Sequence, residues 1–175
     1  MSIDHLFVKI TSALEEREIP YMVSGNMAML VYAVARTTRD LDIVIELNLS
    51  SLPAFFSIFN ERFYLHRASV EEEVKRRGMF NVIDQDSGFK IDFVVKKETA
   101  YRESEFKRRV RLKLFNHEAW FVSPEDLILS KLIWIQQLQS DRQMEDIRTL
   151  LTLPVDRTYL NYWINHLNLS TFNLL

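Results

Sequence analysis

The hydrophobic positions of the chain form short runs separated by turn residues, and their spacing alternates between helical and strand periods. Over residues 2–18, apolar positions from Leu6 to Leu14 recur at helical spacing, with Ser2 as the expected N-cap and Pro20 after the helix. The same patterns predict further helices over 26–34, 53–59, 70–78 and 103–109, and strands over 21–24, 40–47, 79–84, 89–95, 110–115 and 117–122.

The alternation of strands and helices ends at Ser123. Ser123 as N-cap, Pro124 in the first turn and two carboxylates behind it are typical of a helix start. Two or three helices then extend to the C-terminus. We therefore expect an α/β (α+β) protein with a mixed sheet flanked by helices over residues 1–122, and a helical part over 123–175 packed on this core.

Two predicted strands carry aspartates inside apolar runs. Asp40 and Asp42 point to one strand face, and Asp92 interrupts the apolar run of 89–95. If the strands are neighbours, the three carboxylates converge, which suits two Mg²⁺ ions that bridge phosphates. The alternative is that the pair at 40 and 42 ends a strand or binds Arg36 or Arg39.

Ser24, Gly25 and Asn26 lie between the first predicted strand and the helix that follows it. A strand, a glycine and a helix start present backbone N–H groups to a phosphate. The alternative is that Gly25 is simply part of an ordinary turn.

Composition narrows the classes of function. The chain has no cysteine, so it has neither disulfides nor thiolate chemistry, and its net charge of −2 confines any nucleic-acid contact to a local patch. The four histidines lack metal-ligand spacing. Without a signal-peptide pattern or a membrane-spanning run, we expect a cytoplasmic protein with no membrane contact.

Taken in order, these motifs resemble the minimal nucleotidyltransferase superfamily named for DNA polymerase β. The matching stretches are "VSGNMAM" (23–29), "RDLDIVI" (39–45) and "KIDFVV" (90–95). The likeness is stronger still to the branch of AbiE-type toxins and related uncharacterised proteins, through "RTTRDLD" (36–42), "SPEDLILSKLIW" (123–134) and "QMEDIRTLL" (143–151). It extends over residues 20–153.

The resemblance implies a nucleotidyltransferase fold and transfer of a nucleoside monophosphate from an NTP to an acceptor hydroxyl, with Mg²⁺ ions held by the three aspartates. It implies that Lys131 contacts the triphosphate and that Asp146 belongs to the active centre. Taken alone, Lys131 also fits a lysine extending to water, and Asp146 fits a helix-surface residue. The phosphate-binding set would be Ser24, Gly25, Asn26, Arg36, Arg39 and Lys131.

Asn26 departs from the family, which has Gly or Ser at that position. A hydroxyl that would contact phosphate is therefore missing, although an amide can also donate hydrogen bonds. The departure leaves open an inert module that binds nucleotide or protein without turnover.

A basic run suggests an RNA or tRNA acceptor, which also fits the toxin-like branch. A toxin of that branch would in turn have a cognate antitoxin as a partner. The run comprises Lys107, Arg108, Arg109, Arg111 and Lys113. A solvated surface or a small-molecule acceptor is the alternative. Phe55, Phe56, Phe59 and Trp134 have helical spacing and are expected in the core.

Overall fold

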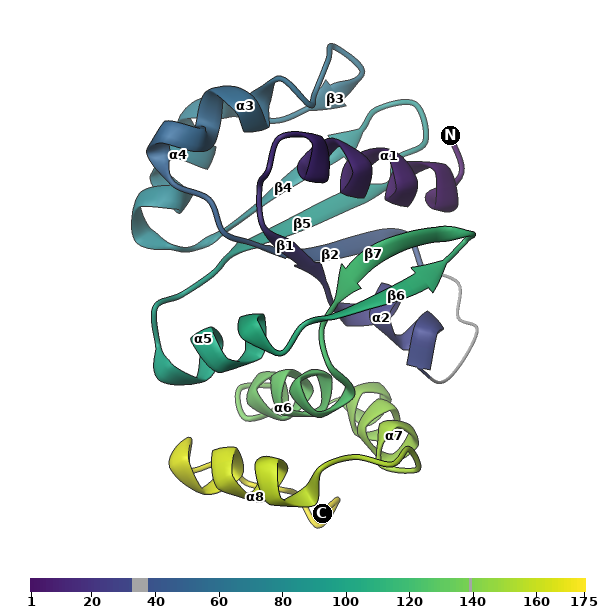
Figure 1. Ribbon diagram of the computed structural model, residues 1–175, viewed down its shortest axis with the longest axis vertical. Helices are drawn as coiled ribbons and strands as arrows, with labels where there is room; N and C mark the ends of the chain where they lie inside the picture. The colour runs from purple at the N-terminus through teal and green to yellow at the C-terminus, as the bar shows by residue number, and fades with distance from the viewer. Residues whose placement is uncertain (33–37, 139) are drawn as a thin grey trace.

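The computed structural model describes residues 1–32, 38–138 and 140–175. Figure 1 shows a twisted sheet with helices on both faces and a group of helices at the C-terminal end. The helices are α1 (Ile3–Glu16), α2 (Gly25–Tyr32), α3 (Leu52–Phe56), α4 (Arg67–Arg76), α5 (Ala100–Lys107), α6 (Pro124–Ile135), α7 (Asp141–Leu150) and α8 (Arg157–His166), with a 3₁₀ turn at Leu49–Ser51. The strands are β1 (Tyr21–Val23), β2 (Asp40–Ile45), β3 (Phe63–Tyr64), β4 (Met79–Asp84), β5 (Lys90–Val95), β6 (Val110–Leu114) and β7 (His117–Phe121).

The strands form one mixed sheet in the order β3-β4-β5-β2-β1-β7-β6. The central pair β2 and β5 is parallel, as are β1 and β7, whereas the other neighbours are antiparallel. This mixed sheet confirms the predicted fold class. Each predicted strand is present, and β3 is an additional short edge strand that the sequence pattern did not predict.

The two faces of the central strands differ in polarity. Residues 41, 43 and 45 of β2 are fully buried, while positions 40, 42 and 44 are only partly covered. On the apolar face, Phe55 of α3 packs edge-on against Phe93 of β5, and Phe7 of α1 packs against Phe121 of β7. The aspartates therefore face the side of the sheet that α2, α5 and α6 cover (Figure 1).

Local capping explains the helix starts in part. The Ser123 hydroxyl accepts from the backbone N–H of Asp126, as predicted. Ser2 does stand at the N-cap of α1, but its hydroxyl binds His5 Nδ1 at 2.7 Å instead of a backbone group. A turn joins β4 and β5, with Gly88 at a positive φ of 70°.

A buried polar cluster joins α5, α6 and α8. Asp126, which is fully buried, accepts hydrogen bonds from Tyr159 Oη at 2.8 Å and from Arg108 Nε at 3.3 Å. Arg108 also lies over the Tyr159 ring, 3.8 Å from its centroid. Within the described residues, no helix combines the length and apolar character needed to cross a bilayer.

Candidate active site

Three carboxylates occupy neighbouring positions on the polar face of the sheet. Because β2 and β5 are parallel and in register, Asp42 pairs directly with Asp92, and Asp40 pairs with Lys90. Side chains opposite each other on adjacent strands share one face. The convergence expected from the sequence therefore occurs, and it requires the strand order that places β5 next to β2.

The start of α2 packs directly against Asp42. Gly25 has a φ of 56°, and a Cβ atom built on it would lie 2.0 Å from Oδ2 of Asp42. The backbone N–H of Ser24 donates to the Asp42 carbonyl at 2.9 Å. Glycine is therefore required here both by its left-handed backbone and by the close approach of a carboxylate.

The ionisation of Asp42 is perturbed by its surroundings. Burial, and next the charge of Asp92, raise its pKa to about 6, while the backbone N–H of Asn26 donates to it and lowers the value. Asp40 raises the pKa further and Lys131 lowers it. A carboxyl that is costly to ionise is a group that gains from a nearby cation.

Lys90 supplies a positive charge within this cluster. Its Nζ lies 2.8 Å from Oδ2 of Asp92 and 4.0 Å from Oδ1 of Asp40. Lys90 lies two residues before Asp92 on β5, so both side chains share the polar face. The sequence analysis did not single out Lys90, although its spacing from Asp92 carries that information.

Lys131 and Asp146 form a buried pair between α6 and α7. Lys131 Nζ donates to Asp146 Oδ2 at 2.9 Å and to Gln143 Oε1 at 2.8 Å. The exposed fractions are 5% for Lys131 and 0% for Asp146. The two alternatives that placed them at the surface are therefore wrong, because both side chains are enclosed by the C-terminal helices.

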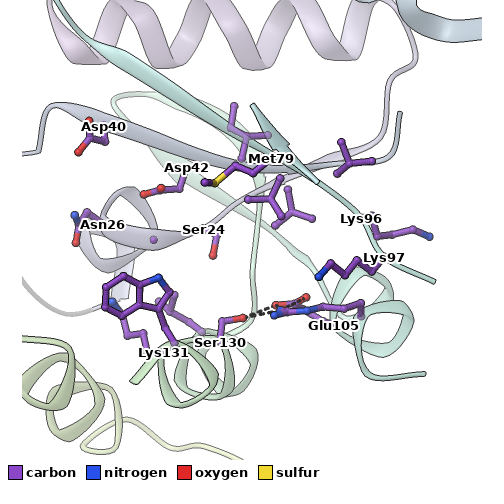
Figure 2. A pocket seen from close by; sticks show the side chains of 18 of the residues that line it. Ser24, Asn26, Asp40, Asp42, Met79, Lys96, Lys97, Glu105, Ser130 and Lys131 are labelled. Atoms are coloured by element: carbon purple, nitrogen blue, oxygen red, sulfur yellow. Dashed lines mark hydrogen bonds and ion pairs between the residues drawn. The ribbon is translucent and has the colours of Figure 1, made fainter. Parts of the chain in front are cut away.

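One pocket of about 470 Å³ connects these elements. Figure 2 shows Asp40, Asp42 and Asn26 at one end of it, with Ser24 between them and Ser130. The residues that line this end are Ser24, Gly25, Asn26, Asp40, Asp42, Lys131 and Gln143. Asp92 and Asp146 are not among the lining residues; Asp92 pairs with Asp42 across β2 and β5, and Asp146 binds Lys131.

The other end of the pocket is built from α5 and β5. Arg102 Nη1 donates to both oxygens of Glu105, at 2.9 and 2.8 Å, and the Ser130 hydroxyl donates to Glu105 Oε1 at 2.7 Å (Figure 2). Burial raises the pKa of Glu105, and Arg102 lowers it. This trio was not predicted from the sequence, because nothing in the residue pattern of α5 marks Glu105 as buried.

Only one of the two predicted arginine contacts, Arg39, belongs to the described residues. Arg39 is exposed and lies outside the lining, and Arg36 falls outside the described residues. In the basic run, Arg108 binds Glu125 and Asp126, Arg111 binds Glu15, and Arg109 stacks on Phe106 and Trp120.

Trp134 corrects one prediction. Phe55, Phe56 and Phe59 are buried as expected, but Trp134 is 52% exposed and lines the pocket. Trp134 does lie on a helix, as its spacing predicted, but α6 is apolar on most of its surface. Spacing alone did not distinguish the side that faces the core from the side that faces the pocket.

The carboxylates fit the chemistry of Mg²⁺. Carboxylate oxygens are its preferred protein ligands, and burial together with the charge of Asp92 destabilises Asp42 as an anion. Across residues 1–32, 38–138 and 140–175, no group of three or more acidic or histidine side chains is already arranged to hold a metal ion. The case for Mg²⁺ therefore rests on the carboxylate donors and on the position of Asp40 and Asp42. In the structure Asp92 forms an ion pair with Lys90.

Comparisons with solved structures identify the fold. ANT(2'')-Ia in complex with adenylyl-2''-tobramycin aligns with 94% of this chain and 96% of its own, at 14% identity and a TM-score of 0.61. Lincomycin-bound LnuA, a lincosamide antibiotic adenylyltransferase, aligns with 86% of this chain and 96% of its own, at 13% identity and a TM-score of 0.56.

A third solved structure, an antigenic nucleotidyltransferase-like protein from Paracoccidioides brasiliensis, aligns with 94% of this chain and 86% of its own, at 15% identity and a TM-score of 0.53. No protein-family model and no curated protein matches the sequence. At these identities the likeness establishes the fold, which is that of the nucleotidyltransferases.

Proposed function

We propose that the protein transfers a nucleotidyl group from a nucleoside triphosphate to a hydroxyl group of an acceptor. One observation carries the proposal. Within the nucleotidyltransferase fold, a single pocket is lined by Gly25 at a helix start, by Asp40 and Asp42, and by the buried Lys131. A helix N-terminus and a lysine bind phosphate oxygens, and paired carboxylates hold the cation that accompanies them.

Each group has a part in this reaction. The backbone at Gly25, the side-chain amide of Asn26 and the ammonium of Lys131 orient the triphosphate, and Asp146 orients Lys131. Asp40 and Asp42 would hold Mg²⁺, which neutralises charge on the phosphates, and Asp92 would act as the base. The acceptor oxygen attacks the α-phosphorus, the bond to the bridging oxygen breaks, and pyrophosphate leaves. The carboxylate of Asp92 accepts the hydroxyl proton.

The acceptor that we favour is a small hydroxylated molecule. Arg108, Arg109 and Arg111 are engaged by acidic or aromatic neighbours, so most of the basic run does not form an unbalanced positive surface. ANT(2'')-Ia is described as an antibiotic-resistance factor, and LnuA as an adenylyltransferase of lincosamide antibiotics. The trio of Arg102, Glu105 and Ser130 offers charged and hydroxyl groups to a polar acceptor.

An RNA or tRNA acceptor remains the second candidate, supported by the exposure of Lys107 and Lys113. A toxin-like role with an antitoxin partner belongs to this candidate and stays a prediction. The inert module is the third.

A transfer assay separates the three. It contains Mg²⁺, each of the four α-labelled nucleoside triphosphates in turn, and either an aminoglycoside and lincosamide mixture or total RNA. We expect label in the small-molecule fraction. Label only in RNA would identify the second candidate, and no label despite nucleotide binding would support the inert module.

Asp42→Asn is the test variant of this assay and Asp86→Asn its matched control. Asp86 is an aspartate with a 64% exposed side chain in the β4–β5 turn, away from the pocket. Loss of transfer in Asp42→Asn alone would support the proposal. Equal transfer by both variants would contradict it.

A further inference from the structure

Trp134 exposes an unusually large apolar surface beside the predicted phosphate site. Its side chain is 52% exposed, and part of it lines the pocket. Indole rings are usually well covered, because their burial contributes a large hydrophobic free energy. An apolar surface left open inside a concave site is typical of ligand contact.

Trp134 lies close to Lys131 on α6. The two residues are three positions apart on α6, so they occupy the same side of the helix, and both line the pocket. A molecule whose phosphates reach Lys131 therefore passes close to the indole.

Met79 provides a second exposed apolar side chain across the pocket. It opens β4, pairs with Val94 of β5, and is 61% exposed although it lines the pocket. In Figure 2 Met79 lies on the sheet wall, two strands away from Asp42 in the sheet, while Lys131 and Ser130 lie on the opposite, helical wall. The pocket thus has apolar groups on both walls.

We propose that Trp134 is the stacking platform for the base of the nucleoside triphosphate, with Met79 packing against the base from the sheet side. This inference rests on the proposed function. A nucleobase has a flat apolar face that suits an indole and a thioether. A polar acceptor suits the charged end at Arg102 and Glu105 better. Stacking of this kind tolerates every base, so it implies affinity without strong base selection.

The test compares two ligands that share phosphates and differ in the base. Binding of Mg²⁺-tripolyphosphate and of Mg²⁺ with an α,β-methylene analogue of ATP is measured by titration calorimetry. The analogue cannot be cleaved at the α–β bond. We expect Trp134→Ala to weaken analogue binding by about 5- to 150-fold and to leave tripolyphosphate binding unchanged. Trp134→Phe should keep most of the affinity.

Leu138→Ala is the matched control, because Leu138 is another exposed apolar residue (62%) just beyond α6 and does not line the pocket. Unchanged analogue binding in Trp134→Ala would overturn the stacking role, and so would an equal loss for both ligands. If wild-type protein binds neither ligand, the proposed function itself fails, which is a distinct result.

Discussion

At the scale of single residues, the candidate site depends on the contact between Gly25 and Asp42. A chain that starts a helix here must pass within van der Waals distance of a carboxylate. The same contact covers Asp42 and contributes to the burial that raises its pKa to about 6. The backbone conformation at Gly25 and the ionisation of Asp42 are therefore linked by one contact.

Gly25→Ala is expected to abolish nucleotide binding, because the added methyl group occupies the space of Asp42 Oδ2. Gly88→Ala is the control: Gly88 also has a positive φ, of 70°, but no heavy atom lies within 4 Å of the added Cβ. Each variant should lose about 1–2 kcal/mol from backbone strain. Binding and thermal unfolding are measured together. Normal nucleotide binding by Gly25→Ala would refute the steric argument.

The raised pKa of Asp42 predicts how the stability of the metal-free protein depends on pH. The unfolded chain loses this proton near pH 3.8 and the folded protein near pH 6. Between these values the folded state holds more protons, so stability falls as the pH rises through this window. Asp42→Asn should remove that dependence and raise stability at pH 7 by about 1–3 kcal/mol. Urea titrations at pH 4, 5, 6 and 7 test this prediction. If the free energy of unfolding changed with pH in parallel for wild type and variant, the prediction would be wrong.

At the scale of elements, buried polar pairs set how the C-terminal helices pack. Lys131 and Asp146 connect α6 to α7, and Asp126 with Tyr159 connects α6 to α8. A buried ion pair contributes little net stability but is costly to break on one side. These pairs therefore specify helix positions more than they stabilise them.

Asp146→Ala should cost about 3–5 kcal/mol, since Lys131 would lose its carboxylate partner in a buried position. The double variant Lys131→Met/Asp146→Leu should recover much of that stability while nucleotide binding stays lost. Asp141→Ala, an exposed aspartate of the same helix, is the control. Chemical denaturation and nucleotide titration measure both quantities. Restored nucleotide binding in the double variant would exclude a phosphate contact by Lys131.

At the scale of the whole molecule, the distribution of charge bears on the acceptor. The chain has a net charge of −2, and the arginines of the basic run are bonded within the fold. The open positive charges of this run are those of the exposed Lys107 and Lys113.

Lys107→Gln/Lys113→Gln is expected to leave transfer to a small-molecule acceptor unchanged. If RNA is the acceptor, the double variant should lose affinity and its binding should depend less steeply on salt, because each phosphate contact releases counterions. Lys9→Gln/Lys75→Gln, which removes the same charge at two lysines outside the pocket lining, is the control. The assay compares transfer rates at low and high salt.

The sequence by itself determined the mixed α/β architecture, most element positions, and the positions of the aspartates on their strands. These follow from periodicity and from rules that act over a few residues, such as the alternation of strand faces. Asp40 and Asp42 could therefore be assigned to one strand face without knowledge of the strand order.

Only the tertiary structure decided which strand lies beside β2, that Lys131 meets Asp146, and that Trp134 faces a pocket instead of the core. Each of these depends on contacts between residues distant in the chain, such as Asp42 with Asp92. It also decided that Glu105 is buried and Arg111 is paired. Burial and charge compensation are properties of the packed surface, and a local pattern of residue types does not contain them.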